Sequence, residues 1–221
     1  MPAPLSETAT PQTRGRTLDH AAAVYDLLAP IMTLGQEGRY RTLAIRLLDL
    51  KGGESILDIG CGTGILTRQI AQRLSAPDAC AVGLDAAPKM IKVAQQHARG
   101  LPHVRFDVGV AETLTYGDAS FDCAASTFFF HHIDAELKRR SLAELLRVLK
   151  PGGKLIIVDV DVPSNWFGRL CAWSGYWLFK QEEIRENILG ELRRALAETP
   201  FREVTRVAHF SGYVTVFQAI K

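Results

Sequence analysis

Short apolar segments alternate with helical patterns between residues 55 and 160, and this alternation constrains the fold more than any other feature of the sequence. The helical patterns repeat leucine or isoleucine at three- and four-residue spacings, whereas the apolar segments are typical of β-strands. The expected strands are Ser55–Ile59, Cys80–Leu84, Val104–Val108, Phe121–Ser126 and Leu155–Val160. Because several of them are apolar at almost every position, we expect an α/β fold in which helices cover both faces of a parallel sheet.

The remaining segments extend this unit at both ends of the chain. Residues 18–50 have a helical pattern that predicts an N-terminal helical cap, and Gln181–Glu198 has the pattern of one amphipathic helix. Two later segments, Val204–Ala208 and Tyr213–Ile220, predict a β-hairpin with Ser211-Gly212 at its turn.

Length and composition exclude several classes of protein. A chain of 221 residues with a hydrophobic fraction of 47% suits one domain, so we expect residues 17–221 to form it and residues 1–16 to be a flexible tail. The net charge of +2, without a basic stripe, predicts no nucleic-acid partner. The four cysteines form no C-x-x-C pair, so neither a metal site nor a disulfide framework is expected. Without a secretory leader or an apolar run of about 20 residues, the expected location is the cytoplasm.

A glycine loop separates the first expected strand from the helical pattern that follows it. Gly60, Gly62 and Gly64 let the backbone turn sharply and let a ligand approach without a Cβ atom in the way. Asp85 ends the next strand about 20 residues further on, where a carboxylate would bind ribose hydroxyls. The loop lacks the Lys-Ser/Thr pair that follows the last glycine of a P-loop. Together these features indicate a nucleoside-binding site.

The charge of Asp58 narrows the choice of nucleoside. A dinucleotide would place its pyrophosphate at this helix N-terminus, and a carboxylate two residues before the first glycine would repel it. S-adenosylmethionine (SAM) has no phosphate and carries a sulfonium and an ammonium group, both of which a carboxylate attracts. Asp58 therefore favours SAM over NAD, although a carboxylate here would also serve to cap a turn.

The residues from Glu54 to Gly64, E-S-I-L-D-I-G-C-G-T-G, resemble the first motif of class I SAM-dependent methyltransferases. Residues 83–90, 106–114, 121–133 and 147–155 are similar to the later motifs of that family, in the same order. The resemblance extends from about Tyr25 to Asp159. It implies a Rossmann-like, doubly wound sheet of about seven strands, mostly parallel with an antiparallel last strand, and it implies SAM as the cofactor.

The same resemblance assigns cofactor-binding roles around the glycine loop. Gly60, Gly62 and Gly64 would shape the pocket for the methionine half of SAM. Cys61, at a position where relatives accept small residues, would pack in this loop and not act as a nucleophile. Asp85 would bind both ribose hydroxyls, because a carboxylate can accept two hydrogen bonds.

Adenine recognition follows from the next two motifs of the resemblance. Ala86 and Met90 would lie near the adenine, and the backbone N–H of Ala111 would donate to the ring. Many relatives carry Asp just before the Ala-Glu pair, where it accepts from the adenine amino group, and this chain has Val110 there. Adenine recognition would then depend on backbone groups, on Glu112 or on water, at a cost of about 1 kcal/mol for the lost hydrogen bond.

Several further residues would border the sulfonium and the acceptor. The resemblance places Ser126 on the sulfonium side and lets Tyr25 close over the pocket, although Tyr25 fits the rim of an ordinary amphipathic helix equally well. Methyl transfer needs alignment and a dry site, so no obligatory acid or base is implied. If the acceptor loses a proton, His131 or His132 is the candidate base; we favour the alternative in which His131 contacts SAM and His132 packs. Asp159 would either face the acceptor or satisfy loop amides.

An aromatic-rich insertion at about 162–180 holds all three tryptophans. Helical spacing puts one set of its residues on a single face: Trp166, Leu170, Trp173 and Trp177. Residues 166–179 would form an apolar lid over a hydrophobic acceptor, or a peripheral membrane contact with Arg169 and Lys180 near headgroups. The alternative is that these rings pack on the edge of the sheet.

The expected function is SAM-dependent methyl transfer to a small-molecule or lipid-like acceptor. Among class I methyltransferases, the quinone C-methyltransferases and phospholipid N-methyltransferases are the most similar groups, but residues 128–133 read F-F-F-H-H-I where the quinone enzymes would have Gly-Leu-Arg-Asn. Two alternatives stay open at this point, namely an NAD(P)-dependent oxidoreductase and a SAM-binding protein without catalysis. The sequence predicts no oligomeric state.

Overall fold

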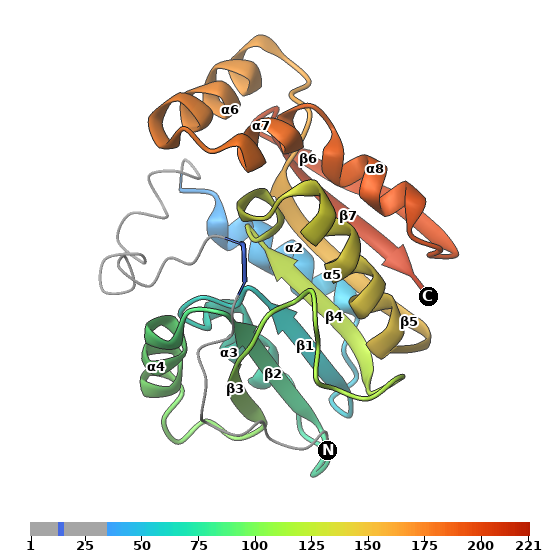
Figure 1. Ribbon diagram of the computed structural model, residues 1–221. Helices are drawn as coiled ribbons and strands as arrows, with labels where there is room; N and C mark the ends of the chain where they lie inside the picture. The colour runs from blue at the N-terminus through green and yellow to red at the C-terminus, as the bar shows by residue number, and fades with distance from the viewer. Residues whose placement is uncertain (1–12, 16–34) are drawn as a thin grey trace.

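One seven-stranded sheet forms the centre of the fold (Figure 1). The computed structural model describes residues 13–15 and 35–221. The strands are β1 Ser55–Ile59, β2 Cys80–Asp85, β3 Val104–Val108, β4 Phe121–Thr127, β5 Leu149–Val160, β6 Glu203–Phe210 and β7 Val214–Ile220. Their order is β3-β2-β1-β4-β5-β7-β6, with β1 to β5 parallel and β7 antiparallel to both of its neighbours. The expected Rossmann-like sheet is therefore confirmed.

Helices cover both faces of this sheet, with α5 and α8 in front of it in Figure 1 and α2 and α3 behind it. The helices are α2 Glu37–Leu48, α3 Ile65–Ala71, α4 Pro88–His97, the 3₁₀ turn η2 Phe130–His132, α5 Ala135–Val148, α6 Trp166–Phe179, α7 Glu182–Ile188 and α8 Glu191–Glu198. Leu57 of β1 packs in the core with α5 and α8, whereas its neighbour Ile56 packs in the core with α2 and α3. Because successive strand residues face opposite cores, the central strands are apolar throughout.

The structure corrects two of the expected elements. The single helix expected over Gln181–Glu198 is two helices, because Gly190 adopts a φ of 91° between α7 and α8. β5 begins at Leu149, earlier than expected, and is irregular where it pairs with Phe121. Within the pattern at 18–50, the described helix is α2, and the earlier part of that pattern lies outside the described residues.

The short described segment Thr13–Gly15 lies on the folded domain. The hydroxyl of Thr13 donates to Glu112 at 2.5 Å, and Arg14 forms an ion pair with Glu136 at 2.5 Å. The rest of the expected tail, and Tyr25, lie outside the described residues. Across the described ranges, no helix has the length and apolar character needed to cross a membrane.

Candidate active site

The glycine loop leaves the carboxyl end of β1 and leads into α3. All three glycines have positive φ, 64° at Gly60, 54° at Gly62 and 76° at Gly64, a region that favours glycine. A Cβ atom would lie 2.6 Å from Phe129 at Gly60 and 2.5 Å from Phe106 at Gly64, whereas at Gly62 it would meet nothing within 4 Å. Two glycines therefore allow close packing, and Gly62 borders open space.

A cleft of about 670 Å³, partly open to solvent, lies beside this loop. The predicted cofactor residues that line it are Gly60, Gly62, Asp85, Ala86, Met90, Ala111 and Glu112. Val110, the departure from the family pattern, also lines this cleft, which we call the nucleoside cleft. The tertiary fold thus brings together residues from three separate motifs.

A second cleft of about 580 Å³ adjoins the first and shares Gly60, Gly62 and Phe128 with it. Cys61 lines it, together with Tyr40 and Arg41 of α2, and we call it the α2 cleft. Arg41 forms an ion pair with Glu37 at 3.1 Å, and its buried Nε has no hydrogen-bond partner within residues 13–15 and 35–221. Sequence reasoning missed these α2 residues, because a helical pattern does not reveal which cleft a helix borders.

Phe128 forms the wall between the two clefts. It lines both of them, and its ring centroid lies 5.7 Å from that of Tyr40. Its φ of 55° is a left-handed conformation that costs a bulky residue roughly 1–3 kcal/mol. The N–H of Phe128 donates to the carbonyl of Val158 at 2.8 Å, which holds this strained turn against β5.

Two carboxylates stand at the ends of β1 and β2. Asp85 accepts hydrogen bonds from the N–H groups of Gly62 and Ala87, both at 2.9 Å, and so ties the two loops together. Asp58 is 1% exposed and accepts from the Thr67 hydroxyl at 2.6 Å, while its Oδ1 has no hydrogen-bond partner in the described chain. Burial, with a further contribution from the charge of Asp85, raises the pKa of Asp58 to about 7. A cationic ligand would lower that pKa again.

His131 is turned toward β5. Its Nδ1 lies 2.7 Å from Asp159, which also accepts from the N–H groups of Phe130 and Val160, each at 2.7 Å. Asp159 is fully buried, so of the two expected roles it has the one that satisfies loop amides, and it also holds the His131 ring. His132, whose ring centroid lies 4.0 Å from that of His131, is the histidine that lines the nucleoside cleft.

Two other predicted residues, Ser126 and Gly64, line neither cleft. Ser126 is fully buried within the sheet, and the α2 cleft is lined by the next residue, Thr127, because successive strand residues face opposite sides. Gly64 precedes α3 as its N-cap. Burial raises the pKa of the Cys61 thiol well above its ordinary value, which agrees with packing and not with nucleophilic reactivity.

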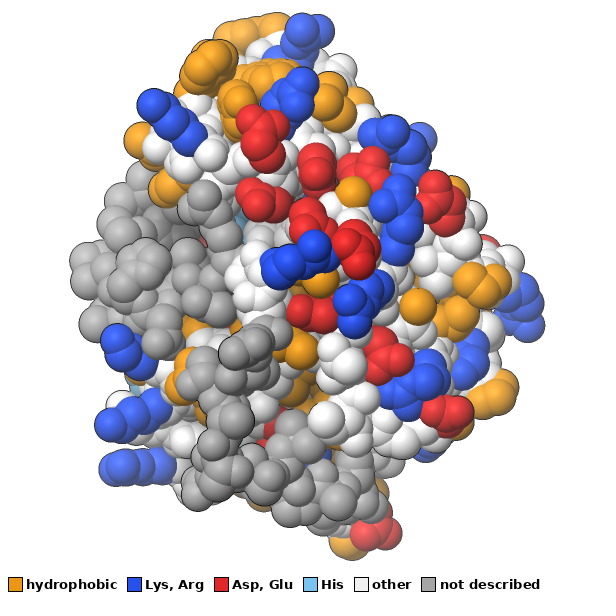
Figure 2. Space-filling view, in the orientation of Figure 1, with side chains coloured by type: hydrophobic (Ala, Val, Ile, Leu, Met, Phe, Trp, Pro, Cys, Tyr) orange, Lys and Arg blue, Asp and Glu red, His pale blue; other side chains and the backbone are white. Residues whose placement is uncertain are grey.

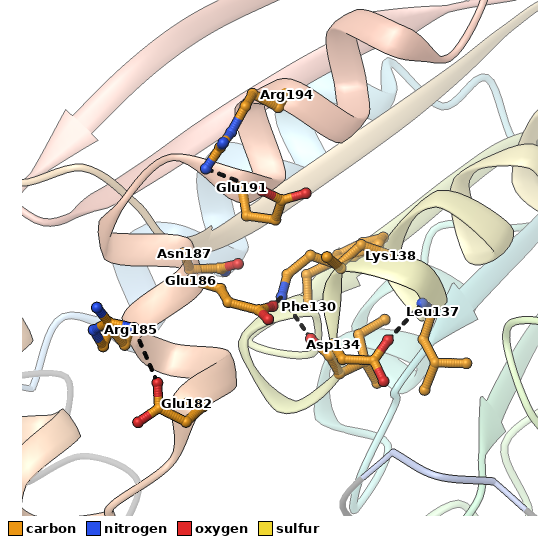
Figure 3. Close-up of polar contacts among 12 residues, drawn as sticks. Phe130, Asp134, Leu137, Lys138, Glu182, Arg185, Glu186, Asn187, Glu191 and Arg194 are labelled. Atoms are coloured by element: carbon orange, nitrogen blue, oxygen red, sulfur yellow. Dashed lines mark hydrogen bonds and ion pairs between the residues drawn. The ribbon is translucent and has the colours of Figure 1, made fainter.

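A buried lysine holds the histidine turn in place. Lys138 of α5 donates to the carbonyl of Ile133 at 2.5 Å and forms an ion pair with Glu186 of α7 at 3.0 Å. Figure 3 shows Lys138 and Glu186 pointing toward each other from the two helices, beside Asp134, which caps α5. Burial lowers the pKa of Lys138. These contacts connect η2, α5 and α7 directly behind the nucleoside cleft.

Comparisons with known proteins agree with this geometry. A family model described as a methyltransferase domain matches residues 56–153. An uncharacterized methyltransferase from Synechocystis is 32% identical over 200 residues, which cover 89% of this chain and 90% of that protein. A demethylmenaquinone methyltransferase from Thermus thermophilus is 39% identical over 144 residues, which cover 64% of this chain and 63% of that protein. The solved structure of a SAM-dependent methyltransferase from Methanosarcina mazei has a TM-score of 0.61 at 25% identity and covers 80% of this chain and 96% of that chain.

The Rossmann-like sheet, the glycine loop and Asp85 beside the nucleoside cleft define an enzyme that binds a nucleoside cofactor. The chain belongs to the SAM-dependent methyltransferase family, and its cofactor is SAM. Family membership decides against an NAD(P)-dependent oxidoreductase.

Proposed function

We propose that this methyltransferase transfers the methyl group of SAM to an apolar or lipid-like small molecule. The observation that carries the cofactor part of this proposal is the junction of the nucleoside cleft and the α2 cleft at Gly60, Gly62 and Phe128. A cofactor with a nucleoside half and an amino-acid half fits two joined clefts better than one. The reactive centre between the two halves would then lie along the Phe128 wall.

Three charged groups would complement SAM: Asp85 lines the nucleoside cleft, Arg41 lines the α2 cleft, and Asp58 is buried and lines neither. Asp58, whose Oδ1 has no hydrogen-bond partner within the described residues, would attract the ammonium and sulfonium charges. Arg41, whose buried Nε has no partner there either, would bind the methionine carboxylate. Asp85 would exchange one of its loop amides for ribose hydroxyls. The residues therefore fit the cofactor at each of its polar groups.

Glu112 is our candidate for adenine recognition in the absence of the usual Asp. Val110 lines the nucleoside cleft but offers only its backbone. The carboxylate of Glu112 lines the same cleft and accepts a hydrogen bond from Thr13 at 2.5 Å. A carboxylate so placed would accept from the adenine amino group in exchange for Thr13, with Met90 and Ala86 packed beside the ring.

The chemistry requires alignment more than proton transfer. SAM supplies an activated methyl group on a good leaving group, and the chain has to hold donor and acceptor in line and dry. His131 lines neither described cleft, so we assign it a positioning role: its bond to Asp159 fixes η2 against β5. His132 of η2 and Phe128 of the preceding turn would then face the cofactor.

The acceptor class is supported by two observations. Phe128 and Phe129 line the nucleoside cleft, so the cleft walls are largely aromatic on the β4 side. Relatives from Geobacter and Thermus thermophilus are named ubiquinone/menaquinone C-methyltransferase and demethylmenaquinone methyltransferase, and the matched segments span 60% and 63% of those proteins. An aromatic or isoprenoid acceptor is consistent with both. A peripheral location at a membrane, where such acceptors dissolve, belongs to the same proposal.

A screen with methyl-labelled SAM tests the acceptor. The panel contains quinol precursors with short and long isoprenoid tails, phospholipids, and small polar amines and phenols. We expect label in organic-extractable products, with kcat/KM rising as the tail lengthens. Label transferred only to polar acceptors would refute the apolar class while leaving the methyltransferase assignment intact.

A further inference from the structure

The helix α6 exposes an unusual number of large apolar side chains. Trp166 is 75% exposed, Leu170 61%, Trp177 68% and Leu178 75%. Figure 2 shows apolar side chains gathered over α6 at the top of the molecule, with Lys and Arg side chains beside them. Contiguous exposed apolar surface of this kind marks an interaction site more often than an ordinary surface.

Packing determines that this face points outward. Gly168 and Ala172 form the buried side of α6, and a Cβ atom on Gly168 would overlap the backbone of Gly212 in the β6–β7 turn. Asn165 caps the helix by accepting from the Gly168 N–H at 2.7 Å. The small residues hold the helix close to the domain, so the large residues of the opposite side are left outside. Of the three tryptophans, only Trp173 packs against the core, so packing on the sheet edge does not account for this face.

The charged residues that the α6 segment itself carries are of one sign. Residues 162–181 contain Arg169 and Lys180, both exposed, and no Asp or Glu. The next acid, Glu182, accepts from the Tyr176 hydroxyl at 2.9 Å and from Arg185 at 3.2 Å. Arg169 lies within α6 and Lys180 is its C-cap, so the two cations flank the apolar face. A partner that complements α6 therefore offers an apolar interior to the tryptophans and leucines, and anionic groups at its surface to the two cations.

We propose that α6 docks the enzyme on an anionic lipid bilayer, lying in the interface with its tryptophans at headgroup depth. Tryptophan is enriched at that depth, and flanking cations add attraction to anionic lipid. A second copy of the chain fits less well, because a two-fold contact would bring Arg169 and Lys180 near their own copies. A single 14-residue helix is also short of the roughly 800 Å² per partner of a stable interface. α6 follows β5, whose carboxyl end lies at the edge that holds the cofactor loops, so α6 lies on the same edge of the sheet as those loops.

Vesicle flotation tests this proposal without reference to methyl transfer. The full chain is mixed with vesicles of phosphatidylcholine containing 30% phosphatidylglycerol, and with vesicles of phosphatidylcholine alone. We expect the wild type to float with anionic vesicles and W166S/W177S to bind at least tenfold more weakly. R169Q/K180Q should bind anionic vesicles about 20-fold more weakly than wild type, and this binding should no longer depend on salt. Its binding to vesicles of phosphatidylcholine alone should equal that of wild type. Leu189→Ser, which removes an exposed leucine between α7 and α8, is the matched control and should bind like wild type.

Two results would overturn the proposal. One is wild-type protein that ignores both vesicle types, or that binds them no better than W166S/W177S. The other is a concentration-dependent dimer, seen by sedimentation, that W166S/W177S abolishes. Circular dichroism and thermal melts check that each variant is folded. We expect them to be folded, because the substituted side chains are exposed and contribute little to the core. Methyl transfer to a soluble acceptor is measured in parallel, so that failed docking and failed catalysis are distinguished.

Discussion

Replacing Asp58 with asparagine should stabilise the free protein and weaken its binding of SAM. Asp58 is a buried carboxyl whose pKa is raised by burial from 3.8 to about 7. A group whose folded pKa exceeds its unfolded pKa contributes stability below the unfolded value and loses it as pH rises through the folded value. The cost of the ionised carboxylate therefore develops between about pH 4 and pH 7, and the neutral amide of the D58N variant does not incur it.

The size of this effect on the free energy of unfolding follows from the rise of the Asp58 pKa from 3.8 to about 7. At about 1.4 kcal/mol per unit, ionised Asp58 costs the folded state about 4 kcal/mol at pH 8. The D58N variant avoids this cost, but it weakens the hydrogen bond from Thr67, which lowers its stability by about 1–2 kcal/mol. The net gain is about 2 kcal/mol at pH 8, which raises Tm by about 4–8 °C, and it falls close to zero at pH 5.

Thermal melts of D58N and wild type at pH 5 and pH 8 measure this difference, and titration calorimetry measures SAM affinity. We expect SAM to bind at least tenfold more weakly to D58N, because a neutral amide does not attract the two cationic groups. Wild type should also release protons on binding SAM near pH 7, as shown by the dependence of the binding heat on buffer ionisation enthalpy, and D58N should not. A lower Tm for D58N at pH 8, or an equal shift at both pH values, would refute the reasoning.

Four further substitutions test the site and its supports. Phe128→Gly should relieve roughly 1 kcal/mol of backbone strain yet weaken SAM binding about tenfold by calorimetry; unchanged affinity would contradict its role as the wall. His131→Asn should lower kcat severalfold without shifting the pH profile, whereas loss of an ionisation from that profile would make His131 a base instead. In urea melts, Glu186→Gln should lower the free energy of unfolding by about 2–3 kcal/mol and Lys138→Met by about 1 kcal/mol. The first loss is larger because it leaves the buried charge of Lys138 unpaired. The reverse order would contradict a charged Lys138 in the fold.

The sequence by itself determined the elements whose signals are local. The strands β1 to β4, the turn of the closing hairpin and the glycine loop were all readable from spacing and from turn residues. Asp85 was predicted to bind ribose from its distance to that loop, and Met90 to lie near the adenine from the family resemblance; both line the nucleoside cleft. In each case a few neighbouring residues decide the backbone conformation, so no knowledge of distant contacts is needed.

Only the tertiary structure decided which faces meet. Arg41 borders a cleft because α2 packs beside the glycine loop, and His131 turns to Asp159 because β5 brings that carboxylate under η2. Trp166 and Trp177 of α6 point outward because Gly168 has to fit against Gly212, more than 40 residues away in the chain. A helical pattern shows that one face is apolar, but the contacts that bury or expose it come from distant segments, and their packing energy decides the outcome.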